Sequence, residues 1–307
     1  MSGRGGLPER IKTMELCDRK EIKALLDRHG FRFSKSMGQN FLIAPWVPQE
    51  TAAESGAAPG VGVLEIGPGI GPLTQQLARR GEKVVAVELD RSLLPVLEET
   101  LAGLGNVTVV PGDILKLDLH ALCQEHFPNM PVVVCANLPY NITTPVLTAL
   151  LESRCFQAVT VMIQREVAQR ICAQPGTAEF GAFTLLCQFY AESTLLYDVP
   201  PDCFYPAPKV TSSVIRMEVR PAPPVEVANP ALFFRVVRAA FSQRRKTLLN
   251  ALYANFGQQL EKEALREALL ACDLTENIRG ERLSFEGFAE LSGKIDQILE
   301  SGQKPLA

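Results

Sequence analysis

The chain has 307 residues, 47% of them hydrophobic, and a formal net charge of −3 at pH 7, so it can form one large domain or two with buried cores. No apolar run approaches the ~18 residues of a membrane span and the first residues lack a signal-peptide pattern, which predicts a soluble, cytoplasmic protein. The eight cysteines include no CxxC pair and the three histidines no HExxH pattern, so we expect neither a zinc site nor metal catalysis.

In the first two thirds of the chain, short apolar runs alternate with helical patterns. Residues 19–30 have the pattern of an amphipathic helix that ends at Gly30. Four buried strands are predicted at 61–66, 83–89, 107–113 and 131–137, with helices at 72–81, 91–104 and 145–153. This alternation predicts a parallel sheet covered on both faces, as in α/β domains.

Further strands are predicted at 157–164 and 209–219, followed by a Pro-rich linker at 220–230. Beyond the linker the pattern is helical, at 231–241, 244–257, 260–273 and 284–301. We therefore expect an N-terminal extension with a short helix (1–30), an α/β domain (31–220) and a small all-helical domain (221–307).

A glycine cluster joins the first buried strand to the next helix. Gly67, Gly69 and Gly71 lie where a backbone can approach a ligand closely because no Cβ intervenes. The pattern is not a strict GxGxxG, because Pro72 and Leu73 follow, and an ordinary tight turn is the simpler alternative.

Two acids at the ends of the next strands favour a nucleoside ligand. Glu88 follows Gly67 by 21 residues, a position from which a carboxylate accepts both ribose hydroxyls. Asp113 ends the third strand, where it can accept a hydrogen bond from an adenine amine. The glycine loop contains no Walker A lysine and no basic residue for a pyrophosphate. A nucleoside without phosphates fits best, which points to S-adenosylmethionine.

The fourth strand leads into Asn137, Leu138, Pro139 and Tyr140 at the same edge of the sheet. Asn and Pro are common in turns, so an ordinary turn is again the alternative. Beside a methyl donor, however, the Asn137 amide oxygen and the Pro139 carbonyl could accept both protons of an adenine amine and orient its lone pair. Tyr140 could stack on that base, and Phe204 is the candidate for a second stacking ring. Such a base must be single-stranded or flipped out of a helix.

Two windows are locally basic. The first is RHGFRFSK (28–35), in which basic residues alternate with two Phe; the second contains Arg244, Arg245 and Lys246 and has no acid nearby. A charge cluster of this kind is often only a solvated surface.

Taken together, these stretches make the chain resemble the rRNA adenine N6-dimethyltransferase family, and within it the KsgA/RsmA small-subunit branch. The matching segments are GQNFL (38–42), LEIGPGIGPLT (64–74), VELD (87–90), GD (112–113), NLPYNITTPVL (137–147), VPPDCFYPAPKVTSSVIR (199–216), AFSQRRKTLLN (240–250) and IRGERLSFEGFAEL (278–291). They occur in the family's order and span nearly the whole chain.

The resemblance implies a Rossmann-like methyltransferase domain with a helical C-terminal domain. It implies transfer of four methyl groups from S-adenosylmethionine to two adjacent adenosines in the 3′-terminal hairpin of small-subunit (16S) rRNA during ribosome biogenesis. It places Asn40, Leu42, Gly67, Gly69, Glu88, Asp113 and Asn137 at the cofactor. It also makes Arg32, Lys35, Arg244, Arg245 and Lys246 candidates for RNA contacts. We expect a monomer that binds the immature small ribosomal subunit, with no metal and no membrane.

Three alternatives remain open at this point. A large-subunit rRNA methyltransferase conferring macrolide resistance would share the catalytic strand, although residues 240–250 and 281–288 favour the small-subunit branch. A DNA adenine methyltransferase usually has an acid or Ser at the position of Asn137 and a target-recognition region, which is not evident here. A non-catalytic assembly checkpoint would not need an intact glycine loop with Glu88 and Asn137, although both roles can coexist.

Overall fold

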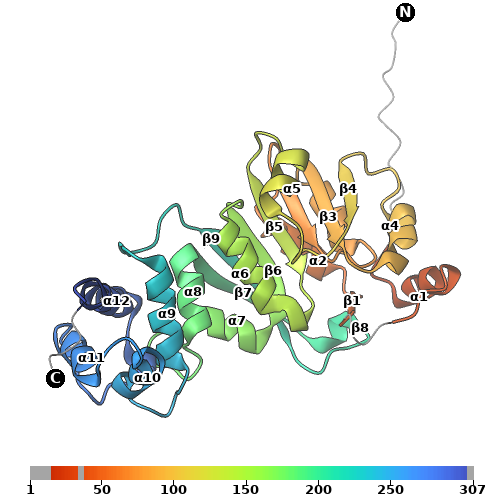
Figure 1. Cartoon of the computed structure of the whole chain (residues 1–307). Coiled ribbons are helices and arrows are strands. Elements are labelled where there is room, and N and C mark those ends of the chain that lie inside the picture. Colours follow the sequence, from red (N-terminus) through yellow and green to blue (C-terminus); the bar gives the residue numbers. More distant parts are fainter. Residues whose placement is uncertain (1–14, 34–37, 303–307) are drawn as a thin grey trace, which may run out of the picture. The chain divides into compact units, whose positions relative to one another are not determined.

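The computed structural model describes residues 15–33 and 38–302, which form two compact units (Figure 1). The first, here called the sheet unit, contains the described residues up to Val146, with Cys155–Gln164 and Tyr197–Arg216. The second, the helical unit, contains Leu147–Arg154, Arg165–Leu196 and the described residues from Met217 on. The division assigns residues 165–196 to the helical unit, whereas the sequence prediction placed its boundary near residue 220.

A seven-stranded sheet has the order β4-β3-β2-β5-β6-β9-β7. Its strands are β2 (Gly62–Ile66), β3 (Lys83–Glu88), β4 (Val107–Pro111), β5 (Val132–Asn137), β6 (Ala158–Gln164), β7 (Ala191–Val199) and β9 (Ser212–Val219). The pairs β2–β3, β3–β4, β2–β5 and β5–β6 are parallel. Parallel pairing brings the carboxyl ends of these strands to one edge of the sheet, where ligands bind in open α/β sheets. The predicted parallel sheet is therefore confirmed.

Helices of the sheet unit cover the central strands, whose residues are almost all buried. They are α2 (Trp46–Ala53), α3 (Pro72–Ala78), α4 (Leu94–Thr100) and α5 (Leu119–His126). Helix α6 (Thr143–Ser153) follows β5 and is divided between the two units after Val146. Ala52 of α2 and Leu77 of α3 share one hydrophobic cluster with Val63, Val84 and Val133 of the strands. Helices α2 and α3 thus pack against the same face of the sheet. Single turns of 3-10 helix are η2 (Arg91–Leu93), η3 (Tyr140–Ile142), η4 (Pro201–Cys203) and η5 (Gly280–Arg282).

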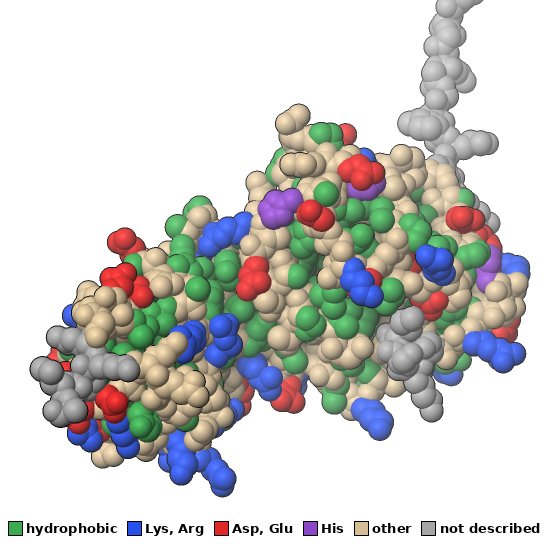
Figure 2. Space-filling model, viewed as in Figure 1, with side chains coloured by type: hydrophobic (Ala, Val, Ile, Leu, Met, Phe, Trp, Pro, Cys, Tyr) green, Lys and Arg blue, Asp and Glu red, His purple; other side chains and the backbone are tan. Residues whose placement is uncertain are grey.

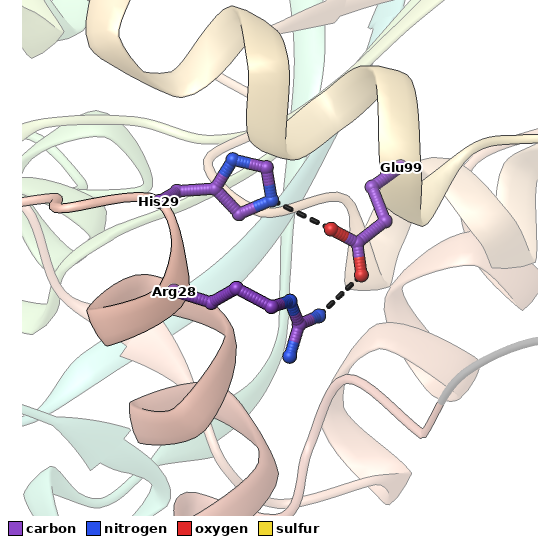
Figure 3. A network of polar contacts seen from close by, with 3 residues as sticks. All are labelled: Arg28, His29 and Glu99. Carbon is purple, nitrogen blue, oxygen red and sulfur yellow. Dashed lines mark hydrogen bonds and ion pairs between the residues drawn. The ribbon is translucent and has the colours of Figure 1, made fainter.

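The N-terminal helix α1 (Arg19–Arg28) begins and ends as its sequence predicts. The carboxylate of Asp18 accepts the N–H groups of Lys20 at 2.8 Å and Glu21 at 3.0 Å, and Gly30 has a φ of +63°. At its C-terminal end Arg28 forms an ion pair with Glu99 of α4, and His29 Nε2 lies 2.6 Å from the other carboxylate oxygen (Figure 3). These contacts fasten α1 to α4.

The helical unit contains α7 (Arg165–Ile171), α8 (Ala182–Tyr190), α9 (Pro230–Phe241), α10 (Leu248–Phe256), α11 (Lys262–Leu270) and α12 (Phe285–Glu300). Its core includes the fully buried Phe180, Phe233, Phe256 and Phe288. The apolar faces of these short helices are stable because they pack on one another rather than through helix propensity alone. No helix in the described ranges is both long and apolar enough to cross a membrane.

One predicted helix begins later than expected. The pattern predicts a helix over 244–257, but residues 242–247 form a turn and α10 begins at Leu248. The Thr247 hydroxyl caps this helix by accepting the N–H of Asn250 at 3.4 Å. Arg244 donates hydrogen bonds to the carbonyls of Ala178 and Phe180. The Thr247 cap and the hydrogen bonds of Arg244 explain why the basic residues 244–246 lie in the turn before α10 and not on the helix.

Candidate active site

One cavity of the sheet unit lies at the carboxyl ends of β2, β3, β4 and β5. It brings together all residues that the sequence analysis placed at the cofactor or the target base: Asn40, Leu42, Gly67, Gly69, Glu88, Asp113, Asn137, Pro139, Tyr140 and Phe204. They come from six separate segments of the chain, so only the fold makes them neighbours.

The glycine loop after β2 has a backbone that requires glycine. Gly67, Gly69 and Gly71 have φ values of +66°, +61° and +95°, a region that L side chains rarely adopt. A Cβ on Gly69 would lie 3.3 Å from the Phe41 ring, and one on Gly71 would lie 2.9 Å from Leu101 Cδ2. The loop therefore exposes bare backbone to the cavity and opens α3.

Glu88 and Asp113 present carboxylates to the cavity. Glu88 ends β3 and is only 6% exposed, and its Oε1 accepts the Asp90 N–H at 2.7 Å. Burial raises the pKa of Glu88, while backbone N–H groups of Asp90 and Gly69 act to lower it. Asp113, after β4, accepts the Leu115 N–H at 3.1 Å. Both carboxylates are held by backbone groups, so their directions are fixed.

The segment 38–42 closes one side of the cavity. Gln39 donates to the Asp90 carboxylate at 2.7 Å, and Asn40 donates to the Gly38 carbonyl at 3.1 Å. Phe41 and Leu42 form β1 (Phe41–Leu42), which pairs antiparallel with β8 (Phe204–Tyr205). Reasoning from residue types alone had missed Asn40 and Leu42, because neither is titratable or part of a periodic pattern; only the family resemblance placed them here.

The turn after β5 carries the candidate catalytic groups. Asn137 pairs with Met162 of β6, and the Leu138 N–H donates to the Met162 carbonyl at 3.1 Å. The Tyr140 hydroxyl lies 2.8 Å from Ser212 Oγ, which fixes the ring. Burial raises the pKa of Tyr140, so the phenol stays protonated.

Pro139 does not suit the role predicted for its carbonyl. That oxygen accepts the Ile142 N–H at 3.2 Å and the Thr143 hydroxyl at 3.3 Å. A carbonyl has two lone pairs, so both are already engaged within the turn. The carbonyl of Leu138, one residue earlier, accepts no hydrogen bond from the described part of the chain. An amine entering the cavity would therefore find its second acceptor at Leu138 and not at Pro139.

Glu65 of β2 also lines the cavity and was not singled out in the sequence. It is 1% exposed, and its Oε2 has no hydrogen-bond partner within residues 15–33 and 38–302. Burial raises the pKa of Glu65 to about 8, with a smaller contribution from the Glu88 carboxylate, and the Thr74 side chain acts in the opposite direction. A glutamate within an apolar strand is a detectable signal, since buried acids are rare unless paired.

Comparison with known proteins decides the family. The model of the ribosomal RNA adenine dimethylase family matches residues 30–284. The chain is 45% identical to ribosomal RNA small subunit methyltransferase A of Alkaliphilus oremlandii, over 91% of this chain and 98% of the relative. It is 47% identical to the protein of the same name from Bacillus cereus, over 92% and 97%. The chain belongs to the ribosomal RNA adenine dimethylase family.

Solved structures show the same fold as this dimethylase. The 23S rRNA methyltransferase ErmE is 26% identical, with a TM-score of 0.64 over 84% of this chain and all of that one. A dimethyladenosine transferase from Plasmodium falciparum is 24% identical, with a TM-score of 0.70 over 83% and 97%. The protein is thus an rRNA adenine dimethyltransferase with a Rossmann-like methyltransferase domain and a helical C-terminal region, in a family of S-adenosylmethionine-dependent enzymes.

None of the described candidate RNA-binding residues of the dimethylase is among the residues that line the cavity. Arg32 is exposed in the sheet unit, and Lys35 falls outside the described residues. Arg244, Arg245 and Lys246 are exposed in the turn before α10 of the helical unit, where Lys and Arg side chains gather on the face in view (Figure 2). Within the described ranges, no group of three His, Cys, Asp or Glu side chains could hold a metal ion.

Proposed function

We propose that this dimethylase transfers methyl groups from S-adenosylmethionine to the N6 atoms of two adjacent adenosines in the 3′-terminal hairpin of small-subunit (16S) rRNA during ribosome biogenesis. The relatives that are 45% and 47% identical are named for the small subunit, which supports this substrate. The observation that carries the proposal is that the glycine loop, Glu88, Asp113 and the turn at Asn137 line one cavity. We further propose a cytoplasmic monomer acting on the immature small subunit.

The lining of the cavity fits the cofactor. Among the described residues, the lining contains acidic side chains, including Glu88 and Asp113, and no Lys or Arg, which suits a nucleoside without phosphates. In the proposed arrangement Glu88 accepts the ribose hydroxyls and Asp113 accepts from the adenine amine, while the backbone at Gly67 and Gly69 allows close approach. Asn40 and Leu42 cover the ligand from the side of β1.

The groups at the Asn137 turn suit an adenine amine as nucleophile. When bound, the cofactor supplies an electrophilic methyl group, so the protein has mainly to orient the amine. Asn137 Oδ1 and the Leu138 carbonyl would accept its two protons and turn the nitrogen lone pair toward the methyl. Tyr140, held by Ser212, would stack on the base, with Phe204 as the second ring. Stacking returns about 1–3 kcal/mol per base, which offsets the cost of flipping.

We propose that the RNA is held by Lys35 and by the exposed basic residues Arg32, Arg245 and Lys246. Arg244, although part of the same cluster, already donates to two backbone carbonyls and is a weaker candidate for a phosphate contact. Contacts of this kind would position the rRNA without reading its sequence.

The test is incubation with labelled S-adenosylmethionine and undermethylated small ribosomal subunits, followed by mapping of the modified nucleotides. Large subunits serve as the control substrate. We expect four methyl groups on two neighbouring adenosines of the small-subunit rRNA and none on large subunits. Label confined to large-subunit rRNA would refute the proposed substrate.

A further inference from the structure

The N-terminal helix α1 is built onto the wall of the cavity. Its Ile22, Leu25 and Leu26 share a hydrophobic cluster with Phe41, Ile70 and Leu93, three residues that also line the cavity. At the C-terminal end of α1, the contacts of Arg28 and His29 with Glu99 attach the helix to α4 (Figure 3). A helix held in both ways presents its remaining side chains in a fixed position beside the site.

The first turn of α1 reaches an aromatic group at the end of β8. The Arg19 guanidinium carbon lies 4.6 Å from the centroid of the Tyr205 ring. The Phe33 ring meets Tyr205 edge-on, with centroids 5.6 Å apart and planes at 86°, and lies 5.4 Å from the Phe41 ring. We call Arg19, Phe33 and Tyr205 the aromatic shelf. It lies next to the cavity wall, because Tyr205 pairs with Phe41 and Phe33 packs on the ring of Phe41, a residue that lines the cavity.

The shelf presents both apolar and cationic groups to solvent. Phe33 is 38% exposed, and Arg19 and Arg32 are exposed. The nearby Asp18 carboxylate caps α1 by accepting two backbone N–H groups, so part of its hydrogen-bonding capacity is used within the helix. A single exposed ring needs no explanation by itself. An exposed ring, a second ring and a stacked guanidinium are, however, the groups on which unpaired RNA bases stack.

We propose that the aromatic shelf binds, by stacking, a base that adjoins the target adenosine. The inference rests on the proposed function and adds a place for the neighbouring nucleotide. Flipping one adenosine into the cavity removes the stacking partner of the next base, and the shelf lies beside the wall formed by Phe41 and Phe204. The proposed targets are two adjacent adenosines. When one of them is in the cavity, the base on the shelf can therefore be the other.

Binding to undermethylated small subunits tests the shelf, with S-adenosylhomocysteine present and cofactor affinity measured separately. Phe33→Leu keeps an apolar side chain without a ring, and we expect it to weaken subunit binding at least about five-fold, the lower limit for one stacked base. Arg19→Gln should also weaken subunit binding. Phe33→Tyr keeps the ring and should bind subunits like the wild type. Cofactor affinity should stay within about two-fold for each. The matched control is Trp46→Leu, an exposed ring of the sheet unit that contacts Tyr197, which should bind subunits like the wild type.

Position is tested by replacing Phe33 with the photoreactive p-benzoylphenylalanine and mapping crosslinks on the rRNA. Crosslinks at a nucleotide beside a target adenosine support the proposal. Crosslinks only elsewhere, or Phe33→Leu binding equal to wild type, would overturn it. If the wild type binds subunits and the p-benzoylphenylalanine variant crosslinks at that place, but the wild type transfers no methyl group, the proposed function fails while the shelf stands. If it transfers normally and Phe33→Leu is indistinguishable, the shelf alone is wrong.

Discussion

Asn137 has a side chain at the end of β5 that lines the cavity, whereas the turn behind it is fixed by hydrogen bonds of its own. Removing its amide should therefore affect the target amine more than the fold. We expect Asn137→Ala to lower methyl transfer by about 10²–10³, the range for losing one oriented polar group in a reaction site. Cofactor affinity should change only a few-fold. Single-turnover transfer to undermethylated subunits, with separate cofactor titration, measures both.

Asn137→Asp is the matched comparison, because it keeps an acceptor oxygen in the same place. It should retain more activity than the alanine variant. Equal turnover of Asn137→Ala and wild type would exclude the amine-orienting role.

The buried Glu65 makes the stability of the cofactor-free protein depend on pH. Its pKa is raised from 4.5 to about 8 in the folded state, so the folded protein holds this proton more tightly than the unfolded chain. The resulting stabilisation is fully present below pH 4.5 and is lost as the pH rises through about 8. Glu65→Gln removes the titration and should raise stability at pH 9 by about 1–3 kcal/mol, the cost of a buried charge without full pairing.

Thermal unfolding at pH 5, 7 and 9 measures this effect. The difference between Glu65→Gln and wild type should grow with pH. The exposed Glu98→Gln, on α4, is the control and should give a difference that does not change with pH. A Glu65→Gln variant that is less stable than wild type at pH 9 would show that the carboxylate has a partner when charged.

At the scale of elements, the turn 242–247 contains basic residues with two different roles. Arg244 binds backbone carbonyls, whereas Arg245 and Lys246 are candidates for phosphate contacts. Arg244→Gln removes the donor to the Ala178 and Phe180 carbonyls and should cost about 0.5–1.5 kcal/mol in the free energy of unfolding. Arg245→Gln and Lys246→Gln should leave that free energy nearly unchanged. Each should instead lower the log–log salt slope of RNA binding by about 0.7–0.9, as expected for one lost phosphate contact.

Chemical denaturation and RNA titrations over a range of salt concentrations separate the two effects. Asn250→Gln, at an exposed position on the outside of α10, controls for substitutions near the turn. A salt slope that does not change in the Arg245→Gln, Lys246→Gln double variant would rule out phosphate contacts at the turn.

The elements that the sequence predicts are those with a strong local pattern. Strands β2, β3 and β5 are nearly continuous buried runs bounded by glycine, proline or polar residues, so their sequence alone distinguishes them. Strand β7 was missed because AESTLLYDV alternates buried, partly buried and exposed residues irregularly, and the two-residue strands β1 and β8 carry no period. The later start of α10 depends on the Thr247 cap and on Arg244 contacts with a distant loop, which no local pattern contains.

Some residues of the candidate site could likewise be predicted from the sequence, and others could not. Glu88, Asp113 and Asn137 could be found because polar residues at the ends of apolar strands are conspicuous, and the parallel sheet then places them together. Asn40 and Leu42 contribute through a short segment pairing with residues more than 160 positions away. Likewise, the engagement of the Pro139 carbonyl depends on the local geometry of η3, which the residue types do not specify.

At the scale of the whole molecule, each unit has a hydrophobic core of its own, and every residue of the cavity belongs to the sheet unit. Ligand binding should therefore stabilise the two units unequally. A ligand at 100 times its dissociation constant adds about 2.7 kcal/mol to the state that binds it. Protection from local opening should concentrate where the ligand makes contact.

Hydrogen exchange with and without S-adenosylhomocysteine tests this distribution in the full chain. We expect slower exchange in residues 38–42, 67–70, 88–90, 112–114 and 137–142, which line the cavity. Amides of α9, α11 and α12 should be protected much less. Glu88→Ala, which loses the proposed ribose acceptor, should bind more weakly and show little protection at the same ligand concentration. Equally strong protection in both units would mean that the cofactor stabilises the molecule as one cooperative body. If residues 38–42 showed no protection, Asn40 and Leu42 would not belong to the cofactor site.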